Sequence, residues 1–188
     1  VFEIEDINME LLKRVNINKI LISKDLIKKL NTENIIKFNS KKFDRNLIDD
    51  LNLNIIMAYG KLVYSKKITI SEDFLTCKGE VNLIEEYPIL YFNCSIIAKD
   101  KKKFLKKFSI KYKDKNELFE LNAKGNINIF NNKVNFKNIT MNQDYEASKE
   151  DLNYFESTFE RILFNEDFQS IFSFKKIKDF ILEISWTI

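Results

Sequence analysis

The sequence predicts an α+β fold: a long-stranded, curved antiparallel β-meander between an N-terminal helical segment and C-terminal amphipathic helices. Apolar residues recur at helical spacing near both ends of the chain, but at every second position between about residue 53 and residue 141. No amphipathic stretch long enough for a parallel crossover separates the alternating segments. A chain of 188 residues with 45% apolar residues can also bury a core of this size.

The N-terminal segment, residues 1–52, is expected to be mixed and mostly helical. SKDLIKKL (23–30) places a potential N-cap serine before apolar residues at helical spacing, and FDRNLIDDL (43–51) has the same spacing. VFEIEDI (1–7) alternates like a strand instead. Because the chain begins with Val1 rather than methionine, we interpret it as one folded unit excised from a longer protein.

Residues 53–141 are expected to form the antiparallel sheet, with strands joined by short polar connections. The DKKKFLKKF connection (100–108) is the one that we expect to contain a helical turn. The alternating segments are GKLVYSKKITI (60–70), FLTCKGEVNLI (74–84), PILYFNCSIIA (88–98), KFSIKY (107–112), LFELNAKGNINIF (118–130) and KVNFKNITM (133–141).

Residues 147–188 are expected to form a helical cap. SKEDLNYFESTFERILF (148–164) begins with Ser148 and Asp151 at the spacing of a capping box and continues with an apolar stripe. EDFQSIF (166–172) and the KKIKDFILEI segment after it predict one or two further amphipathic helices.

All 3 glycines of the chain stand at the head of an alternating phrase: GKLVYS (60–65), KGEVNLI (78–84) and KGNINIF (124–130). Glycine weakens a strand but allows it to bend sharply. We interpret the phrases as a hairpin repeat in which glycine creases the sheet. Chance similarity is the alternative, because the composition is dominated by Ile, Asn, Lys and Phe.

The first hairpin has a register that the sequence predicts. A turn centred on residues 85–86 places Cys77 opposite Cys94, and it places Gly79 opposite Phe92, where a missing side chain leaves room for the aromatic ring. Opposed strand residues are close enough for a disulfide, which we expect in an oxidising compartment. Two reduced, buried cysteines in a cytosolic protein are the equal alternative.

The second hairpin is expected to turn at Asn131-Asn132, since asparagine tolerates positive φ. This turn pairs Ile127 with Phe136 and brings Gly125 opposite Asn138.

Together the strands are expected to present one polar face and one apolar face that lines a groove. Such an area exceeds what a soluble monomer usually exposes, so either the C-terminal helices or a lipid must cover it. The expected groove residues are Leu75, Val81, Leu83, Leu90, Phe92, Ile96, Phe119, Leu121, Ile127, Ile129, Val134 and Phe136.

The residue types argue against catalysis. The chain has no histidine, which excludes Ser-His-Asp and Cys-His mechanisms, and its 2 cysteines are too few for a structural zinc site. It also lacks a glycine-rich phosphate loop. We therefore expect neither an enzyme nor a bound metal or cofactor. Arginine occurs only at positions 14, 45 and 161, so no nucleic-acid partner is expected.

Three segments resemble the C-terminal region of AsmA-like proteins, the bacterial relatives of bridge-like lipid-transfer proteins built from repeating β-grooves. They are CKGEVNLIEEYPILYFNCSI (77–96), AKGNINIFNNKVNFKNITM (123–141) and SKEDLNYFESTFERILF (148–164). The resemblance covers under half of the chain.

The resemblance implies a non-enzymatic, membrane-associated protein of the cell envelope that acts in lipid transport or outer-membrane assembly. It would lie on the periplasmic side of the bacterial inner membrane, anchored through a segment outside this sequence. Its partners would be phospholipid or other acyl chains in the β-groove. The alternative is a structural or protein-interaction domain whose sheet is fully closed by its own helices.

Overall fold

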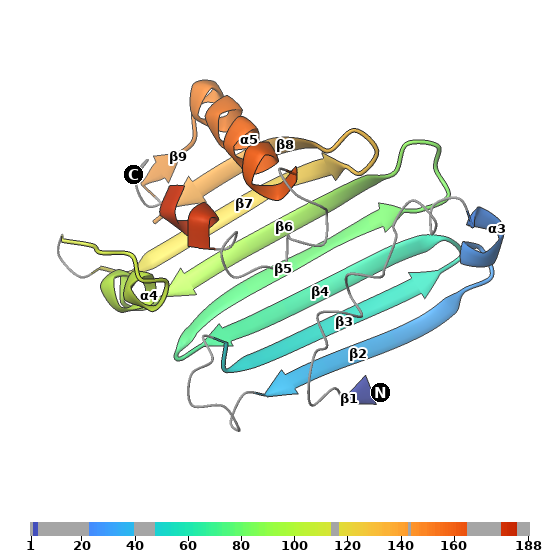
Figure 1. Cartoon of the computed structure of the whole chain (residues 1–188), viewed down its shortest axis with the longest axis horizontal. Coiled ribbons are helices and arrows are strands. Elements are labelled where there is room, and N and C mark those ends of the chain that lie inside the picture. The colour runs from blue at the N-terminus through green and yellow to red at the C-terminus, as the bar shows by residue number, and fades with distance from the viewer. Residues whose placement is uncertain are drawn as a thin grey trace.

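The computed structural model describes residues 2–3, 23–39, 48–113, 117–142, 144–164 and 178–183. These residues contain a nine-stranded sheet whose spatial order follows the chain order, and its first and last strands are not paired with each other (Figure 1). Every neighbouring pair is antiparallel except β1 and β2. The predicted antiparallel meander is confirmed. The strands are β1 (Phe2–Glu3), β2 (Asn31–Asn39), β3 (Asp50–Ala58), β4 (Lys61–Ile70), β5 (Asp73–Asn82), β6 (Ile89–Ala98), β7 (Phe119–Asn128), β8 (Lys133–Met141) and β9 (Tyr145–Glu146).

The N-terminal part contains more strand than the sequence predicts. Helix α3 (Lys24–Ile27) lies within the expected helix at 23–30, but residues 31–39 form β2, which pairs with β3 along its whole length. The expected helix at 43–51 is wrong at its end, because residues 50–51 open β3. Leu51 is the first member of an alternating series that continues along β3, and this pattern prevails over its helical spacing. Residues 43–47 lie outside the described part of the chain.

The KFSIKY segment (107–112) is not a strand, contrary to the prediction. The expected helical turn before it is confirmed as α4 (Lys101–Lys107), whose N-cap Asp100 accepts a hydrogen bond from the backbone N–H of Lys103 at 2.7 Å. Both Phe108 and Ile110 donate backbone hydrogen bonds to Leu105, so the last turn of α4 uses donors that a ladder would need. Phe108 and Ile110 are buried in the main core.

The register of the first hairpin is confirmed: Cys77 pairs with Cys94 and Gly79 with Phe92. The register of the second hairpin differs by two residues, because Gly125 lies opposite Phe136 and not opposite Asn138. Side chains cause the shift, since the Asn128 amide oxygen accepts hydrogen bonds from the backbone N–H groups of residues 130 and 131 and so closes a wider turn. A shift of two residues leaves the side chains of residues 133–136 on their predicted faces. Asn138 is different, because it lies opposite Lys124 on the polar face and not on the face of Gly125.

A β-bulge follows on β8. The register changes between Lys124 and Gly125, so that Lys137 has no partner on β7. Phe136 and Ile139 are therefore both buried, although they are separated by an odd number of positions.

Gly60 does not crease a strand. Tyr59 and Gly60 form the tight turn between β3 and β4, with φ values of 51° and 87°. The glycine-repeat interpretation is therefore wrong for Gly60, whose positive φ serves the turn, whereas Gly79 and Gly125 lie inside β5 and β7.

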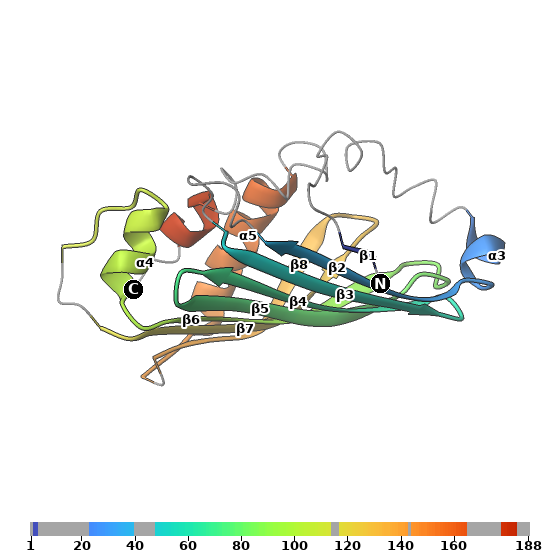
Figure 2. The ribbon, with the colours of Figure 1, turned by 90° about the horizontal axis from the view of Figure 1, so that it is seen from below.

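The predicted C-terminal helix is confirmed as α5 (Lys149–Phe164), and residues 178–183 are also helical. The capping box predicted at the start of α5 is present, since Ser148 N–H donates to the Asp151 carboxylate at 2.9 Å and Asp151 N–H donates to the Ser148 hydroxyl at 3.2 Å. Figure 2 shows the sheet from its side, with α4 and residues 178–183 on the same side of it. The main core lies between these helices, α5 and the sheet.

Candidate functional site

One side of the sheet, here called the apolar face, carries most of the large apolar residues of β3–β8. Its polar members are Tyr64, Lys66 and Asp73, and the Asp73 carboxylate accepts a hydrogen bond from Lys99 N–H at 3.1 Å. The residues of the face are Leu51, Leu53, Ile55 and Met57 on β3; Leu62, Tyr64, Lys66, Ile68 and Ile70 on β4; Asp73, Leu75, Cys77, Gly79 and Val81 on β5; Leu90, Phe92, Cys94, Ile96 and Ala98 on β6; Phe119, Leu121, Ala123, Gly125 and Ile127 on β7; and Val134, Phe136, Ile139 and Met141 on β8.

Every groove residue expected from the sequence packs in the apolar clusters of this face. Val81, Leu83, Ile96, Phe119, Leu121, Val134 and Phe136 are buried, whereas Leu75, Leu90, Phe92, Ile127 and Ile129 are half-buried. Leu83 and Ile129 follow the ends of their strands and still reach the smaller cluster around Ile27 of α3. The inside–outside assignment of these residues is therefore confirmed.

A row of alternating aromatic residues and glycines crosses the apolar face. In this row Tyr64, Gly79, Phe92, Gly125 and Phe136 are consecutive cross-strand partners on β4–β8. A Cβ atom added to Gly79 would meet Tyr64 Cε1 at 2.8 Å, and one added to Gly125 would meet Phe92 Cζ at 2.8 Å. Each ring thus lies over the glycine of the next strand, and the ring over Gly79 belongs to Tyr64 rather than to the expected Phe92.

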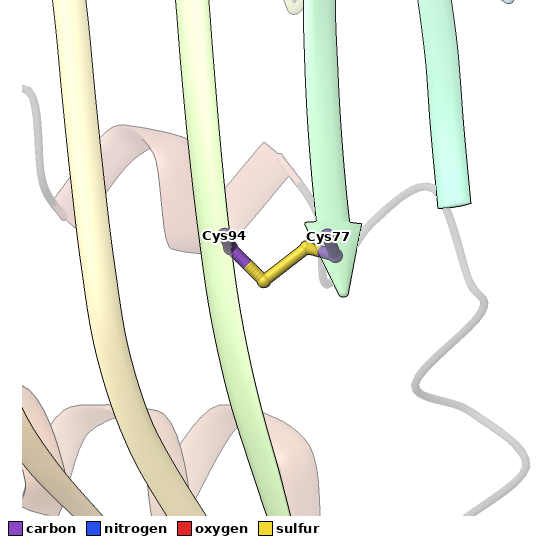
Figure 3. Close-up of a disulfide and its surroundings, with 2 residues drawn as sticks. All are labelled: Cys77 and Cys94. Atoms are coloured by element: carbon purple, nitrogen blue, oxygen red, sulfur yellow. A yellow bond between two sulfur atoms is a disulfide. The ribbon is translucent and has the colours of Figure 1, made fainter. Parts of the chain in front are cut away.

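Beside this row, Cys77 and Cys94 form a disulfide between β5 and β6, with a Cα–Cα distance of 4.1 Å (Figure 3). Their side chains project from the apolar face, where Lys66 is the partner of Cys77 on β4 and Ala123 is the partner of Cys94 on β7. The bond therefore links the two central strands at the middle of the face.

Helix α5 covers the β8 end of the apolar face (Figure 1). Phe155 is buried in the core, and Phe159 lies with its ring centroid 5.0 Å from Phe136 and 3.9 Å from Phe180. Phe92 continues this aromatic cluster at 5.7 Å from Phe136. These contacts make the β6–β8 half of the face part of a packed core.

The same helix also closes the hydrogen-bonding edge of the sheet. Glu156 accepts a hydrogen bond from Phe136 N–H at 2.8 Å, and Glu160 accepts one from Val134 N–H at 3.0 Å. β9 pairs with the far end of β8. An exposed strand edge invites pairing with another chain, and these contacts remove the donors that such pairing would use.

The β3–β4 half of the face is less buried, except at Ile68 and Ile70, which belong to the main core. Leu53, Ile55, Met57 and Leu62 are all half-buried, and none of them belongs to the groove residues expected from the sequence. The alternation along residues 51–57 is the signal that identifies them, but the helical interpretation of 43–51 obscured where it begins. Lys66, which alternation also places on this face, was missed because lysine is so common in the chain.

Large apolar side chains are exposed at the end of the sheet where β3, β5 and β7 finish, and we call this set the exposed rim. Tyr87 and Phe130 contact each other there at a ring-centroid distance of 6.0 Å. The set is Leu26 and Leu30 next to α3, Tyr59 in the β3–β4 turn, Tyr87 in the β5–β6 loop and Phe130 in the β7–β8 loop, and their exposed fractions lie between 42% and 77%.

Metal clusters and membrane-spanning helices are absent from the described ranges. No cluster of three His, Cys, Asp or Glu side chains there could hold a metal ion. None of the helices described above is long and apolar enough to cross a membrane. The lysines of α4 are mostly exposed, and buried Lys101 is paired with Glu117 at 3.1 Å.

Comparisons with family models, with curated proteins and with solved structures find no match to this chain.

Proposed function

We propose that this protein is a non-enzymatic module of the bacterial cell envelope that holds acyl chains against the β3–β5 half of its apolar face. The observation that carries the proposal is the uneven burial of one continuous surface. Next to α5, the apolar-face residues Val134, Phe136, Ile139 and Met141 of β8 are all buried, while Leu53, Ile55 and Met57 on β3 remain half-buried. An acyl chain is the simplest ligand that would bury the remainder, since it needs only apolar contact.

Two further features support an envelope location on the periplasmic side of the inner membrane. The Cys77–Cys94 disulfide is typical of proteins in oxidising compartments. The exposed rim presents tyrosine, phenylalanine and leucine side chains at one edge, which is a composition suited to the interface of a bilayer. A module of this kind would serve lipid transport or outer-membrane assembly, as the AsmA-like resemblance also implies.

Site-specific photocrosslinking tests the proposal. A photoreactive amino acid at Ile55 points to the apolar face, whereas the same residue at adjacent Ile56 points to the opposite face, where the side chain is 39% exposed. Expressed in the envelope of a bacterial host, the Ile55 variant should crosslink phospholipid or another acyl lipid, and the more exposed Ile56 variant should not. Equal crosslinking at both positions, or none at Ile55, would contradict the proposal.

The second candidate is a structural or protein-interaction domain that has no ligand. The packed aromatic cluster of Phe92, Phe136 and Phe159 favours it, because this half of the face has already been closed by the protein itself. Native mass spectrometry of protein extracted from its own membranes separates the two candidates. A ligand-free mass under conditions that preserve lipid adducts would favour the interaction domain.

A further inference from the structure

Lys66 stands in an environment that does not suit a cation. It lies in the middle of β4 on the apolar face, between Leu53 on β3 and Cys77 on β5. Along its own strand it is flanked on this face by Tyr64 and Ile68. Among the described strands β3–β8, it is the only cationic side chain on the apolar face.

The one lysine that is fully buried in the described ranges has partners. Lys101 is 4% exposed, its ammonium group lies 3.1 Å from the Glu117 carboxylate, and it stands over the Tyr112 ring at 4.6 Å. Burial alone would lower the pKa of Lys101, but the hydrogen bonds with Tyr112 and Glu117 hold the pKa above its ordinary value.

Lys66 has no such partner within the described structure. Burial lowers the pKa of its amine, and no hydrogen bond or ion pair acts in the other direction. A partly desolvated ammonium group without a counter-charge costs stability. A ligand that brings an anion to this position would remove that cost.

Tyr64 adds a second donor that has no acceptor among the described residues. It lies on the same side of β4, about 7 Å from Lys66 between Cα atoms as strand geometry dictates. Its hydroxyl oxygen lies 3.0 Å from the position of a Cβ atom added to Gly79, so the hydroxyl is placed over the face itself. Burial raises the pKa of Tyr64, which keeps the hydroxyl protonated and able to donate at neutral pH.

We propose that Lys66 and Tyr64 bind the carboxylate of a long-chain fatty acid whose alkyl chain lies on the half-buried β3–β5 part of the apolar face. This assignment rests on the proposed acyl-binding function and names its ligand. One cation matches one singly charged head group, and the position in the middle of a 10-residue strand favours a small head over the larger head group of a phospholipid. The surrounding leucine and isoleucine side chains provide contact for the alkyl chain on both sides.

The test compares palmitate with hexadecanol, which has the same chain and no charge. Binding to the intact protein is measured by titration calorimetry at neutral pH, below the concentrations at which either compound aggregates. We expect palmitate to bind about tenfold more tightly than hexadecanol, as a charge-assisted hydrogen bond to Lys66 would give. Lys66→Met should abolish this preference, and Tyr64→Phe should reduce it.

Lys78→Met is the matched control. It removes the same charge from the neighbouring strand β5, but Lys78 is exposed on the opposite face, so the preference for palmitate should persist. A second measurement needs no variant: the NMR titration of palmitate labelled with ¹³C at its carboxyl group should show a bound carboxyl pKa below that of palmitate in solution.

Each outcome has a distinct meaning. Equal affinity for palmitate and hexadecanol, or an unshifted carboxyl pKa, would overturn the Lys66 site while the acyl-binding function stands. Binding of neither compound would overturn the acyl-binding function and the site with it. Displacement of palmitate by phosphatidylglycerol at equal concentration, dependent on Lys66, would replace the fatty acid with an anionic phospholipid and so overturn the assignment of the ligand.

Discussion

Phe136 on β8 and Ile55 on β3 lie in the same row of the apolar face, but they are buried to different extents. Phe136 is 4% exposed and contacts Phe159 of α5, whereas Ile55 is half-buried together with its neighbours on β3. The strands all supply apolar surface, and the helices that pack on it, α4 between β6 and β7 and the segments that follow β8, determine which part of it becomes core. The difference teaches that one half of the sheet supplies more of the packed core, while the other half keeps half-buried apolar surface, to which the proposed function assigns a ligand.

The largest expected effect comes from cutting a side chain out of the covered half. Phe155→Ala should lower the free energy of unfolding by about 3–5 kcal/mol, since Phe155 is 1% exposed and its removal leaves a cavity. Ile55→Ala should cost roughly 1–2 kcal/mol, because a half-buried side chain loses less contact. Urea unfolding of both variants measures the difference. Equal losses would mean that the two halves are equally packed, which would remove the basis of the comparison.

The disulfide joins the two halves, because Cys77 lies on β5 and Cys94 on β6. Its reduction should lower the free energy of unfolding by about 3 kcal/mol, the chain-entropy value for a short loop such as this one, with a sequence separation of 17. Hydrogen exchange should accelerate more in β3–β5 than in β7–β8, where α5 holds the strands. Thiol titration of the denatured protein checks the premise, and two free thiols in protein purified from the envelope without reductant would contradict it.

Introducing a carboxylate into the aromatic cluster tests the polarity of the two faces. Phe92→Asp should cost about 2–3 kcal/mol, because an unpaired carboxylate beside Phe136 must be either desolvated or protonated. Asn93→Asp is the matched control: the residue adjoins Phe92 but projects from the opposite face, so its effect should be within about 0.5 kcal/mol. Melting temperatures of the two variants provide the measurement, and similar shifts would contradict the assignment of the faces.

Removal of the unpaired cation from the less buried half should have a smaller effect with the opposite sign. Lys66→Met should raise the stability of the ligand-free protein by about 1 kcal/mol at pH 7 while it weakens fatty-acid binding. Because the folded-state pKa of Lys66 is lowered, the unfolded chain binds more protons between that pKa and about 10.4, and wild-type stability should rise with pH in this window.

Lys66→Met should lack this rise. Above about pH 10 the raised pKa of Tyr64, the titratable neighbour of Lys66 on this face, acts in the opposite direction because the unfolded chain ionises first. The measurement is chemical denaturation between pH 7 and pH 10. A destabilised Lys66→Met protein would show that the amine has a partner and that the less buried half is not adapted to an anion.

The alternation of apolar residues in the sequence predicted which face of the sheet each side chain occupies more accurately than it predicted the register of the strands. The pairing of Cys77 with Cys94 was predictable because the apolar residues on both sides of residues 85–86 are arranged symmetrically. The register of the second hairpin was not predictable, because hydrogen bonds of the Asn128 and Asn131 side chains determine its turn. The alternation of apolar residues carries no information about such bonds. The bulge on β8 did leave a signal, since its buried residues change from a spacing of two to a spacing of three after Phe136.

The groove residues expected from the sequence overlap the proposed acyl-binding part of the face only on β5. The residues expected to line a groove lie mainly on β5–β8, and α5 and its neighbours cover most of them. Their hydrophobicity was readable from the sequence, but the position at which a helix docks depends on contacts between distant segments, such as Phe159 with Phe136. The position of Lys66 on the apolar face was readable from the alternation along β4. That this lysine has no counter-charge among the described residues could be seen only in the structure.

The smallest expected effect concerns the beginning of α5, which determines how firmly the covered half stays covered. Ser148→Ala should cost about 1 kcal/mol, because it removes the hydroxyl that accepts from Asp151 N–H. The first turn of α5 and the core contact of Leu152 should then exchange amide hydrogens faster, while β3 and β4 should be unaffected.

Acid should weaken the same cap. Hydrogen bonds from the Ser148 backbone N–H, from its hydroxyl and from Tyr145 hold the pKa of Asp151 below its ordinary value. The stability that this carboxylate provides is therefore present above its unfolded-state pKa of about 3.9 and is lost as the pH falls through the lower folded-state value. Hydrogen exchange at pH 7 measures the fraying of α5 in the Ser148→Ala variant. Thermal melts at pH 5 and pH 3 measure the effect of acid, and the melting temperatures of Ser148→Ala and wild type should converge at the lower pH. Persistence of the full difference at pH 3, or an exchange response confined to β3 and β4, would show that the cap does not control how the β6–β8 half is covered.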